Sequence, residues 1–324
     1  MQGQVSNKCF SNEVLTSPMR ISERRLAMTR RDLLKVLPAA AAALPALPSS
    51  LLANARIHNG GRARLRSAIC AYSFRRELQS KKLSYEDLVD MAVENGIDGL
   101  DLTVYWFPQT GLDAFLTSLR RKAYLAAVEI PSIAIRSNLC RPQLRDQEIE
   151  VAWLSHWVDI ADRLGATHVR IFGGTTPEGS TEDQAAQWCV EILKRAAEHA
   201  EKRGVILGLE NHGGITLHAE RIIQIVEAVN SPWVGINLDT GNFTTDPYKQ
   251  MEMCLPYAVN SQFKTAIHID GREEASDWER IAKMFAKAGY KGYMALEYEA
   301  EQDAMTAVPR HLKTLRELAR KYSS

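Results

Sequence analysis

The 324-residue sequence lacks an excess of charge of either sign, because 40 lysines and arginines face 39 aspartates and glutamates. This balance does not indicate a basic surface for nucleic acid, nor an acidic, disordered chain. Cysteine is scarce as well, and none of the five cysteines forms a Cys-x-x-Cys pair. A zinc–thiolate site is therefore not expected. For the four cysteines after Cys9 we predict buried thiols, with one or two disulfides as the alternative.

The sequence also lacks an apolar run long enough to span a membrane. The uncharged stretch at 36–52 contains three prolines and is shorter than the ~20 residues that a membrane helix needs. It follows the twin-arginine pattern TRRDLLK at 29–35, directly after Met28, an alternative translation start, and it precedes Ala-Asn-Ala at 53–55. Basic, apolar and small-residue segments in this order are typical of an export signal. We therefore predict that residues 1–55 are a twin-arginine export signal with an N-terminal extension. The mature protein is expected to be periplasmic or otherwise exported by the twin-arginine route, without membrane contact.

Beyond a short linker predicted at 56–66, the chain lacks interdomain linkers and low-complexity stretches. It also lacks a G-x-G-x-x-G motif after its first apolar run, which an open dinucleotide-binding sheet would carry. Eight strand-like runs alternate strictly with eight helix-like runs over residues 67–322. This alternation predicts an α/β fold of one domain, a closed (β/α)8 TIM barrel.

The expected elements follow from apolar periodicity and from helix start and stop signals. Ser84 and Thr181 are expected N-caps, and Gly96, Gly165 and Gly204 are expected to end the preceding helices. The expected strands are 67–74, 99–104, 132–136, 168–172, 205–210, 233–239, 265–269 and 293–297. The expected helices are 84–95, 112–127, 147–164, 181–203, 217–229, 248–257, 278–288 and 304–321.

Four potential metal ligands recur at equal steps in the second half of the chain. They are Glu210, Asp239, His268 and Glu297, and 239 − 210, 268 − 239 and 297 − 268 all equal 29. A step of about 30 residues is the length of a strand-plus-helix unit, and each residue lies near the end of an expected strand. Catalytic side chains of such barrels stand at these strand ends. Three carboxylates and an imidazole suit one divalent ion, Mn²⁺, Mg²⁺ or Co²⁺, with Zn²⁺ as a further option.

Side-chain alternation adds a second observation. The inward positions two residues before the four ligands are Gly208, Asn237, Ala266 and Ala295. Three of these residues are small, whereas an ordinary barrel interior is filled by large branched side chains. We expect the space above them to be where the four ligands converge.

Four short segments carry a resemblance to a known family. The segments are Glu-Asn-His-Gly-Gly at 210–214, Leu-Asp-Thr-Gly-Asn at 238–242, Ala-Ile-His at 266–268 and Leu-Glu-Tyr-Glu at 296–299. They resemble the xylose isomerase-like TIM barrel superfamily, in particular its sugar isomerase and epimerase branch. The resemblance covers about residues 67–320.

The resemblance implies roles for the four ligands. Glu210, Asp239, His268 and Glu297 would hold the divalent ion, and Glu210 and Glu297 would also act as acid and base on opposite faces of a sugar. A metal that holds a carbonyl and the adjacent hydroxyl acidifies the C–H bond between them and stabilises the enediolate. One glutamate then removes the proton and the other returns it.

Two departures from the family pattern restrict the substrate. The family often has a histidine three residues after the aspartate, where this chain has Asn242. Its seventh strand usually reads His-x-Lys-Asp, whereas the sequence from His268 reads His-Ile-Asp-Gly. The missing lysine favours unphosphorylated sugars. Endonuclease IV chemistry is disfavoured, because its trinuclear zinc site needs more histidines at strand ends.

Several further residues are candidates for substrate contact. His212 follows Glu210 closely and could bind substrate, or it could be a plain loop histidine. Arg170 could hold a substrate oxygen or pair with Glu210. Trp106 and Tyr72 follow the second and first strands, where aromatic rings could stack on a sugar or simply pack together. Asp101 and the Ser-Asn pair after the third strand are weaker polar candidates.

The leading prediction is an exported, metal-dependent sugar isomerase or epimerase acting on a small-molecule sugar or polyol-derived ketone. A lyase is the first alternative, since the same enediolate with a leaving group β to the carbonyl eliminates; a 3-keto-glycoside eliminase or an inosose dehydratase would be of this kind. A non-catalytic sugar-binding barrel is the second alternative. Homo-oligomerisation is left open.

Overall fold

The computed structural model describes residues 56–58 and 60–323. The predicted export signal at 1–55 lies outside the described residues. Within the described part of the chain, no helix has the length and apolar character needed to cross a lipid bilayer.

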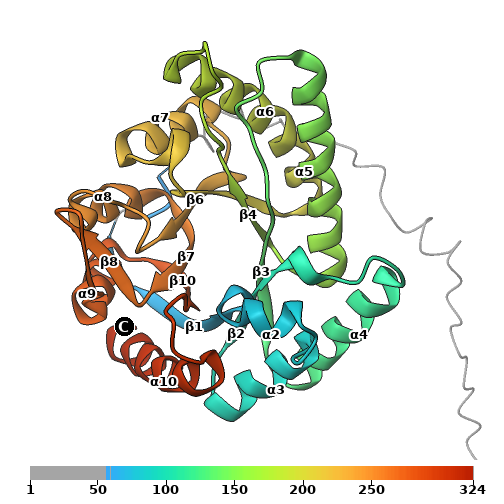
Figure 1. Ribbon diagram of the computed structural model, residues 1–324, viewed down its shortest axis with the longest axis vertical. Coiled ribbons are helices and arrows are strands. Elements are labelled where there is room, and N and C mark those ends of the chain that lie inside the picture. The colour runs from blue at the N-terminus through green and yellow to red at the C-terminus, as the bar shows by residue number, and fades with distance from the viewer. Residues whose placement is uncertain (1–55, 59, 324) are drawn as a thin grey trace, which may run out of the picture. The chain divides into compact units, whose positions relative to one another are not determined.

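Eight parallel strands close into a barrel in the order β1-β10-β7-β6-β5-β4-β3-β2, and helices surround the ring of strands (Figure 1). The predicted TIM barrel is confirmed. The barrel strands are β1 (Arg64–Cys70), β2 (Gly99–Thr103), β3 (Glu129–Ala134), β4 (His168–Phe172), β5 (Ile206–Glu210), β6 (Val234–Asp239), β7 (Ala258–Lys264) and β10 (Lys291–Glu297). The α-helices are α2 (Arg75–Gln79), α3 (Tyr85–Asn95), α4 (Leu112–Leu125), α5 (Leu144–Leu164), α6 (Glu182–Arg203), α7 (Ala219–Val229), α8 (Pro247–Cys254), α9 (Trp278–Ala288) and α10 (Ala304–Tyr322).

The helix boundaries follow local signals in the sequence. The Ser84 hydroxyl accepts a hydrogen bond from the backbone N–H of Asp87, and the Asp87 carboxylate accepts one from the backbone N–H of Ser84, which forms a capping box at the start of α3. Thr181 opens α6 with the same arrangement. Gly96 and Gly204 end these two helices at φ values of 62° and 67°, a left-handed conformation that glycine adopts without strain.

The seventh barrel strand is not the predicted segment 265–269. The barrel strand is β7, and β8 (Ala266–Ile269) instead pairs antiparallel with β9 (Arg272–Ala275) in a separate two-stranded sheet. The sequence of β7 hid the strand because polar side chains occupy its alternate positions Asn260, Gln262 and Lys264. An apolar periodicity criterion reads such a segment as a loop. The equal spacing of 29 residues therefore joins three strand ends and one residue of the β8–β9 hairpin.

The first strand also differs from the prediction. It begins at Arg64 instead of Ser67, so its first three residues had been assigned to the linker 56–66. The predicted strand ended at Phe74, whereas residues 71–74 form a 3₁₀ turn. The turn places Tyr72 beyond the end of β1.

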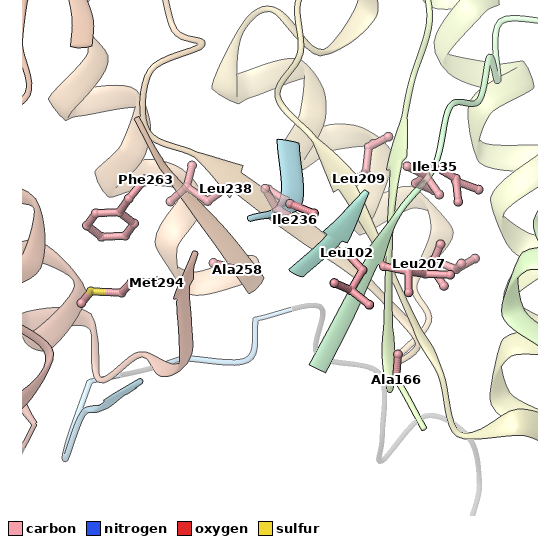
Figure 2. Packing of buried hydrophobic residues seen from close by; sticks show 14 of the residues in the cluster. Leu102, Ile135, Ala166, Leu207, Leu209, Ile236, Leu238, Ala258, Phe263 and Met294 are labelled. Carbon is pink, nitrogen blue, oxygen red and sulfur yellow. The ribbon is translucent and has the colours of Figure 1, made fainter. Parts of the chain in front are cut away.

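The large apolar side chains of the barrel strands point outward, toward the helices. Figure 2 shows Leu102, Leu209, Ile236, Leu238 and Phe263 among the side chains of this shell, and all five are fully buried. Burial of such side chains contributes about 1.5–3 kcal/mol each. The contact between strands and helices is therefore the main hydrophobic core.

The barrel interior is mainly polar, unlike the branched aliphatic packing typical of this architecture. Asn260 Nδ2 donates to Asn237 Oδ1 at 2.9 Å, and Asn237 Nδ2 donates to Gln262 Oε1 at 2.9 Å. Ser132 Oγ and His168 Nδ1 lie 2.8 Å apart. These bonds satisfy polar groups that would otherwise be costly to bury.

Gly208 does not leave open space beneath the site, as its small size had suggested. A Cβ atom at this position would lie 2.0 Å from Nε2 of His168, so the imidazole already occupies the volume. Burial lowers the pKa of His168 to about 3, and the charge of Arg170 adds to this effect. The ring is therefore neutral. Ala266 belongs to β8 and does not lie beneath the site on a barrel strand.

The four cysteines of the described chain are all free and buried: Cys70, Cys140, Cys189 and Cys254. This agrees with the thiol prediction. The closest pair is Cys140 and Cys189, whose sulfur atoms lie 3.8 Å apart, well beyond the length of a disulfide bond.

Candidate active site

Four charged side chains lie at the carboxyl ends of four consecutive barrel strands. Glu210 ends β5, Asp239 ends β6, Lys264 ends β7 and Glu297 ends β10. The three carboxylates are almost completely buried. Carboxyl ends of parallel strands meet at one edge of the barrel. The strand order therefore places the three carboxylates at this edge, with a lysine between Asp239 and Glu297.

Lys264 is the residue that the sequence analysis missed. The expectation that the seventh strand lacks a lysine was wrong, because it concerned the segment 265–269, whereas the barrel strand β7 ends in a lysine. Its Nζ atom lies 3.6 Å from Oδ2 of Asp239 and 3.6 Å from Oε1 of Glu297. It also forms an ion pair with Glu299 at the rim. The side chain is 12% exposed. An ammonium ion thus stands among the carboxylates, in a place where the prediction had put a metal ion.

Local contacts fix the position of Lys264. Its backbone N–H donates to Oγ1 of Thr240 at 3.0 Å, and its carbonyl accepts from Nε1 of Trp278 at 2.7 Å. Gly241 gives the aliphatic stem room, because a Cβ atom there would lie 2.5 Å from Lys264 Cγ. The same glycine donates its N–H to Oδ1 of Asp239 at 2.8 Å. The segment Leu-Asp-Thr-Gly-Asn therefore positions both the aspartate and the lysine.

Glu210 is held on the other side of the site. Its Oε2 lies 2.9 Å from Nε of Arg170, and both side chains are 3% exposed. Asn242, the residue that stands where the family often has a histidine, donates from Nδ2 to Oε1 of Glu210 at 3.1 Å. Arg170 is anchored in turn by the carbonyl of Ile135 at 3.2 Å and by the hydroxyl of Tyr105 at 3.4 Å.

Burial shifts the pKa values of two carboxyl groups of the site upward. Burial raises the pKa of Glu210 well above its usual range; Arg170 opposes the shift and Asp239 adds to it. Burial also raises the pKa of Asp239 to about 7, with Lys264 opposing and Glu297 adding. For Lys264, burial acts to lower the pKa, but Asp239 and Glu297 raise it overall. The surroundings thus favour the ammonium form of Lys264 and, for Glu210 and Asp239, the protonated carboxyl group.

Aromatic side chains stand on the opposite arc of the mouth. Tyr72 follows β1, and Tyr105 and Trp106 follow β2 in a short 3₁₀ turn. The rings of Tyr72 and Trp106 are stacked with centroids 6.1 Å apart, and Tyr72 meets Tyr105 edge-on at 6.4 Å. All three are half-buried. An aromatic wall facing a charged wall suits a ligand that has both C–H faces and hydroxyl groups.

His212 lies at the rim, beyond the end of β5. Its ring packs against the Phe172 ring with centroids 4.0 Å apart. The guanidinium of Arg170 lies 4.1 Å from the centroid of the same Phe172 ring. Partial burial lowers the pKa of His212, and the charges of Arg170 and Lys264 lower it further. The structure therefore brings His212 to the Arg170 side of the mouth.

His268 lies in the β8–β9 hairpin and not at a barrel strand end. It lines a small pocket of about 170 Å³ together with Lys264, Glu273 and Glu297. Its Nδ1 atom is buried without a hydrogen-bond partner. The hairpin thus brings His268 to the rim above Lys264, outside the row of strand-end residues.

The residues of this site do not fit a resident divalent ion. Oε2 of Glu210, Oδ2 of Asp239 and Oε2 of Glu297 are buried and lack hydrogen bonds. The first faces Arg170 at 2.9 Å and the second faces Lys264 at 3.6 Å, and Lys264 also lies 3.6 Å from the other carboxylate oxygen of Glu297. A divalent ion between Asp239 and Glu297 would stand beside the ammonium and be repelled by it. Over residues 56–58 and 60–323, no three His, Cys, Asp or Glu side chains are grouped so that they could hold a metal.

Asp101 lies below the site on β2, inside the barrel. Burial raises its pKa to about 6, while Ser132 and Arg170 oppose this shift. Nδ2 of Asn260 donates to Oδ2 of Asp101 at 3.4 Å, and Oδ1 of Asp101 has no hydrogen-bond partner. The aspartate belongs to the polar floor of the site.

Comparison with known proteins identifies relatives of this chain. A family model described as xylose isomerase-like TIM barrel matches residues 89–318. The alpha subunit of 3'-dehydrocarminate deglycosidase from Microbacterium sp. is 25% identical over 186 residues, which are 54% of this chain and 49% of that protein. A 3-dehydroshikimate dehydratase from Bacillus anthracis is 21% identical over 210 residues, 64% of this chain and 74% of that protein. The chain thus spans about half the length of the deglycosidase subunit.

Solved structures share the fold at low identity. D-psicose 3-epimerase from Clostridium cellulolyticum H10, solved with D-tagatose, has a TM-score of 0.64 at 15% identity and covers 79% of this chain and 99% of its own. A xylose isomerase-like TIM barrel protein from Mycobacterium smegmatis, in complex with magnesium, has a TM-score of 0.64 at 18% identity and covers 80% and 98%. At these identities the likeness concerns the fold alone.

Proposed function

The chain belongs to the xylose isomerase-like TIM barrel family, and we propose that it is an enzyme that removes a proton from the carbon beside the carbonyl group of a sugar-derived ketone. The observation that carries this proposal is the buried row of carboxylates at the strand ends, flanked by Arg170 and Lys264. Ionisable groups with shifted pKa values in a barrel mouth are the usual parts of proton-transfer sites.

Two glutamates take the proton-transfer roles. Glu297 faces the ammonium of Lys264, so it is the carboxylate suited to accept the proton. Burial raises the pKa of Glu210, and we assign its carboxyl group the role of proton donor. When Glu297 takes the proton, the C–H electron pair moves toward the carbonyl oxygen and gives an enolate. Arg170 keeps Glu210 in place through the 2.9 Å contact.

Elimination is the outcome that we propose first. The enolate re-forms the carbonyl and expels the group on the β carbon, and Glu210 gives its proton to the departing oxygen. Atoms balance, because the substrate loses one proton and one leaving group, as water or an alcohol. The names of both curated relatives support this outcome, since a dehydratase and a deglycosidase each remove a group from a dehydro compound.

Epimerisation or isomerisation is the second candidate. Glu210 and Glu297 stand on β5 and β10, which are separated by β6 and β7 in the barrel wall. A substrate between them could lose a proton to one glutamate and receive one from the other on its opposite face. The same enolate serves both reactions, so the fate of the β substituent decides between them.

The remaining candidates are proposed to bind the substrate. Tyr72 and Trp106 would stack on the C–H face of the sugar. Arg170 and His212 would donate hydrogen bonds to its hydroxyl groups. A neutral, polyhydroxylated small molecule suits these aromatic and charged side chains better than a phosphate does. Arg170 and Lys264 are already paired with carboxylates, so neither cation is free to bind a phosphate.

The test is a screen of ketoses, inososes and 3-keto-glycosides in D₂O, followed by mass spectrometry. Elimination gives a product lighter by water or by the aglycone, whereas epimerisation gives a product of the same skeleton with one deuterium. Glu297→Gln should abolish both signals, and Glu301→Gln, at a side chain that is 94% exposed, should keep them. Binding of these compounds without any exchange or product would reject the proposal in favour of a sugar-binding barrel.

A further inference from the structure

We infer that Lys264 supplies, as an ammonium ion, the positive charge that stabilises the enolate oxygen in this site, in the place of a resident divalent metal ion. The enolate comes from the proposed function, on which this part of the inference rests. The replacement of a metal ion by Lys264 rests on the geometry of the site. Its first observation is position. Lys264 ends β7, between the strands that carry Asp239 and Glu297, and its Nζ lies 3.6 Å from a carboxylate oxygen of each.

Formal charges give the second observation. Nζ of Lys264 pairs with Glu299 and lies 3.6 Å from oxygen atoms of Asp239 and Glu297, so one positive charge already stands among these three carboxylates. A divalent ion placed between Asp239 and Glu297 would be repelled by this ammonium. The ammonium therefore provides the cation at the position that a metal ion would take.

The third observation is that Lys264 is held in position. The 3.0 Å bond from its N–H to Thr240 and the 2.7 Å bond from Trp278 to its carbonyl fix the backbone. The stem passes Gly241 at a distance that excludes any Cβ there, and Glu299 pairs with the ammonium from the rim. The group is thus preorganised, which is what electrostatic stabilisation of a developing charge requires.

The chemistry of the step is that of an oxyanion site. Glu297 takes the proton, the electron pair moves to the carbonyl oxygen, and an N–H of Lys264 donates a hydrogen bond to that oxygen as negative charge develops. Lys264 keeps all its protons, and no electron leaves the substrate. Nothing besides the substrate is consumed.

Metal binding is tested without any substrate. The full chain is purified, its metal content is measured, and its melting temperature is recorded with EDTA and with Mn²⁺. We expect less than stoichiometric metal and no shift. Lys264→Met, and more strongly Lys264→His, should gain stabilisation by Mn²⁺, with a rise of about 5 °C at saturating ion. Lys287→Met, at a lysine that is 80% exposed, should behave like the parent.

The outcomes are separable. One tightly bound divalent ion per parent chain, with a fall in melting temperature on its removal, would overturn the inference, and so would variants of Lys264 that fold but gain no response to Mn²⁺. In the D₂O exchange assay the parent should keep its rate in EDTA. Lys264→Met should lose about 100-fold in kcat with little change in KM, as for removal of one oxyanion donor, and Lys264→Arg should keep part of the rate. If no compound exchanges at all, the proposed function fails, while the metal measurements still decide whether the ammonium replaces the ion.

Discussion

Lys264 and Glu297 are register partners on the neighbouring strands β7 and β10, and Nζ of the lysine lies 3.6 Å from Oε1 of the glutamate. The pair joins a fixed cation to the group proposed to accept a proton. Backbone hydrogen bonds between the two strands set this relationship, so it does not depend on a mobile loop.

The Arg170–Glu210 ion pair should be costly to break from one side. Arg170→Met leaves a buried carboxylate without its partner at 2.9 Å, and we expect a loss of about 3–5 kcal/mol in the free energy of unfolding. Urea titration measures this loss. The double variant Arg170→Met with Glu210→Gln should recover much of it, because both charges are then absent. A double variant as unstable as the sum of the two single variants would contradict a direct pair.

Asp101 should make stability depend on pH in a defined direction. Its pKa is about 6 in the folded protein against a usual 3.8, so the folded state binds more protons between these values. Stability contributed by this group is therefore lost as pH rises from about 4 to about 6, and the loss is constant above that range.

The measurement is the difference in stability between Asp101→Asn and the parent across that pH range. The difference should grow in favour of the variant and reach at most about 3 kcal/mol above pH 7. His168 has a lowered pKa of about 3, so it makes the fold less stable as pH falls below ~6.5. This effect on stability is the same in the variant and the parent and cancels in their difference. A difference in stability that does not change with pH would show that folding does not raise the pKa of Asp101.

Gly208 and His168 should be coupled. Gly208→Ala places a methyl group 2.0 Å from Nε2 of His168, and such overpacking costs about 1–3 kcal/mol. His168→Ser removes the ring and its 2.8 Å contact with Ser132, at a cost of its own. In a double-mutant cycle followed by urea unfolding, the double variant should be more stable than the sum of the single changes indicates. Additive costs would place the two side chains apart.

Trp106 should act on substrate affinity more than on turnover. Its half-buried ring stacks on Tyr72, and it follows β2, whereas the proposed proton-transfer groups end β5 and β10. We expect Trp106→Ala to raise KM about tenfold with kcat changed less than twofold, because one stacking contact contributes about 1 kcal/mol or slightly more. Steady-state kinetics of the exchange reaction measure both constants. Tyr124→Ala, at an 82% exposed ring on α4, is the matched control, and a fall in kcat alone would argue for a different role of Trp106.

The sequence predicted the elements whose signals are local. Capping at Ser84 and glycine stops such as Gly96 are short-range features, and the structure has the helix ends where these residues stand. Strand β6 was found because Ile236 and Leu238 give an apolar run, although its other face is polar. These signals act over a few residues, so they do not need the tertiary structure.

The seventh strand and its lysine could not be found in the same way. β7 carries Asn260, Gln262 and Lys264 toward the interior, and only the closed barrel makes these polar residues favourable in a strand. The nearby apolar run at 266–269 was therefore predicted to be the seventh strand. The equal spacing of His268 from the other candidate ligands favoured the same prediction. A period-2 reading of polar residues from Asn260 onward would have been the available signal.

The barrel strands present different chemistry on their two faces, as β6 shows with Ile236 and Leu238 outward and Asn237 and Asp239 inward. Cohesion with the helices resides in one set of residues, and the reaction chamber in the other. Substitutions within the chamber can therefore change which cation it contains or which group it expels while leaving the outer packing intact. A relative that differs only at its inward positions would keep this architecture and perform another reaction, so divergence in this family should be sought on one side of each strand.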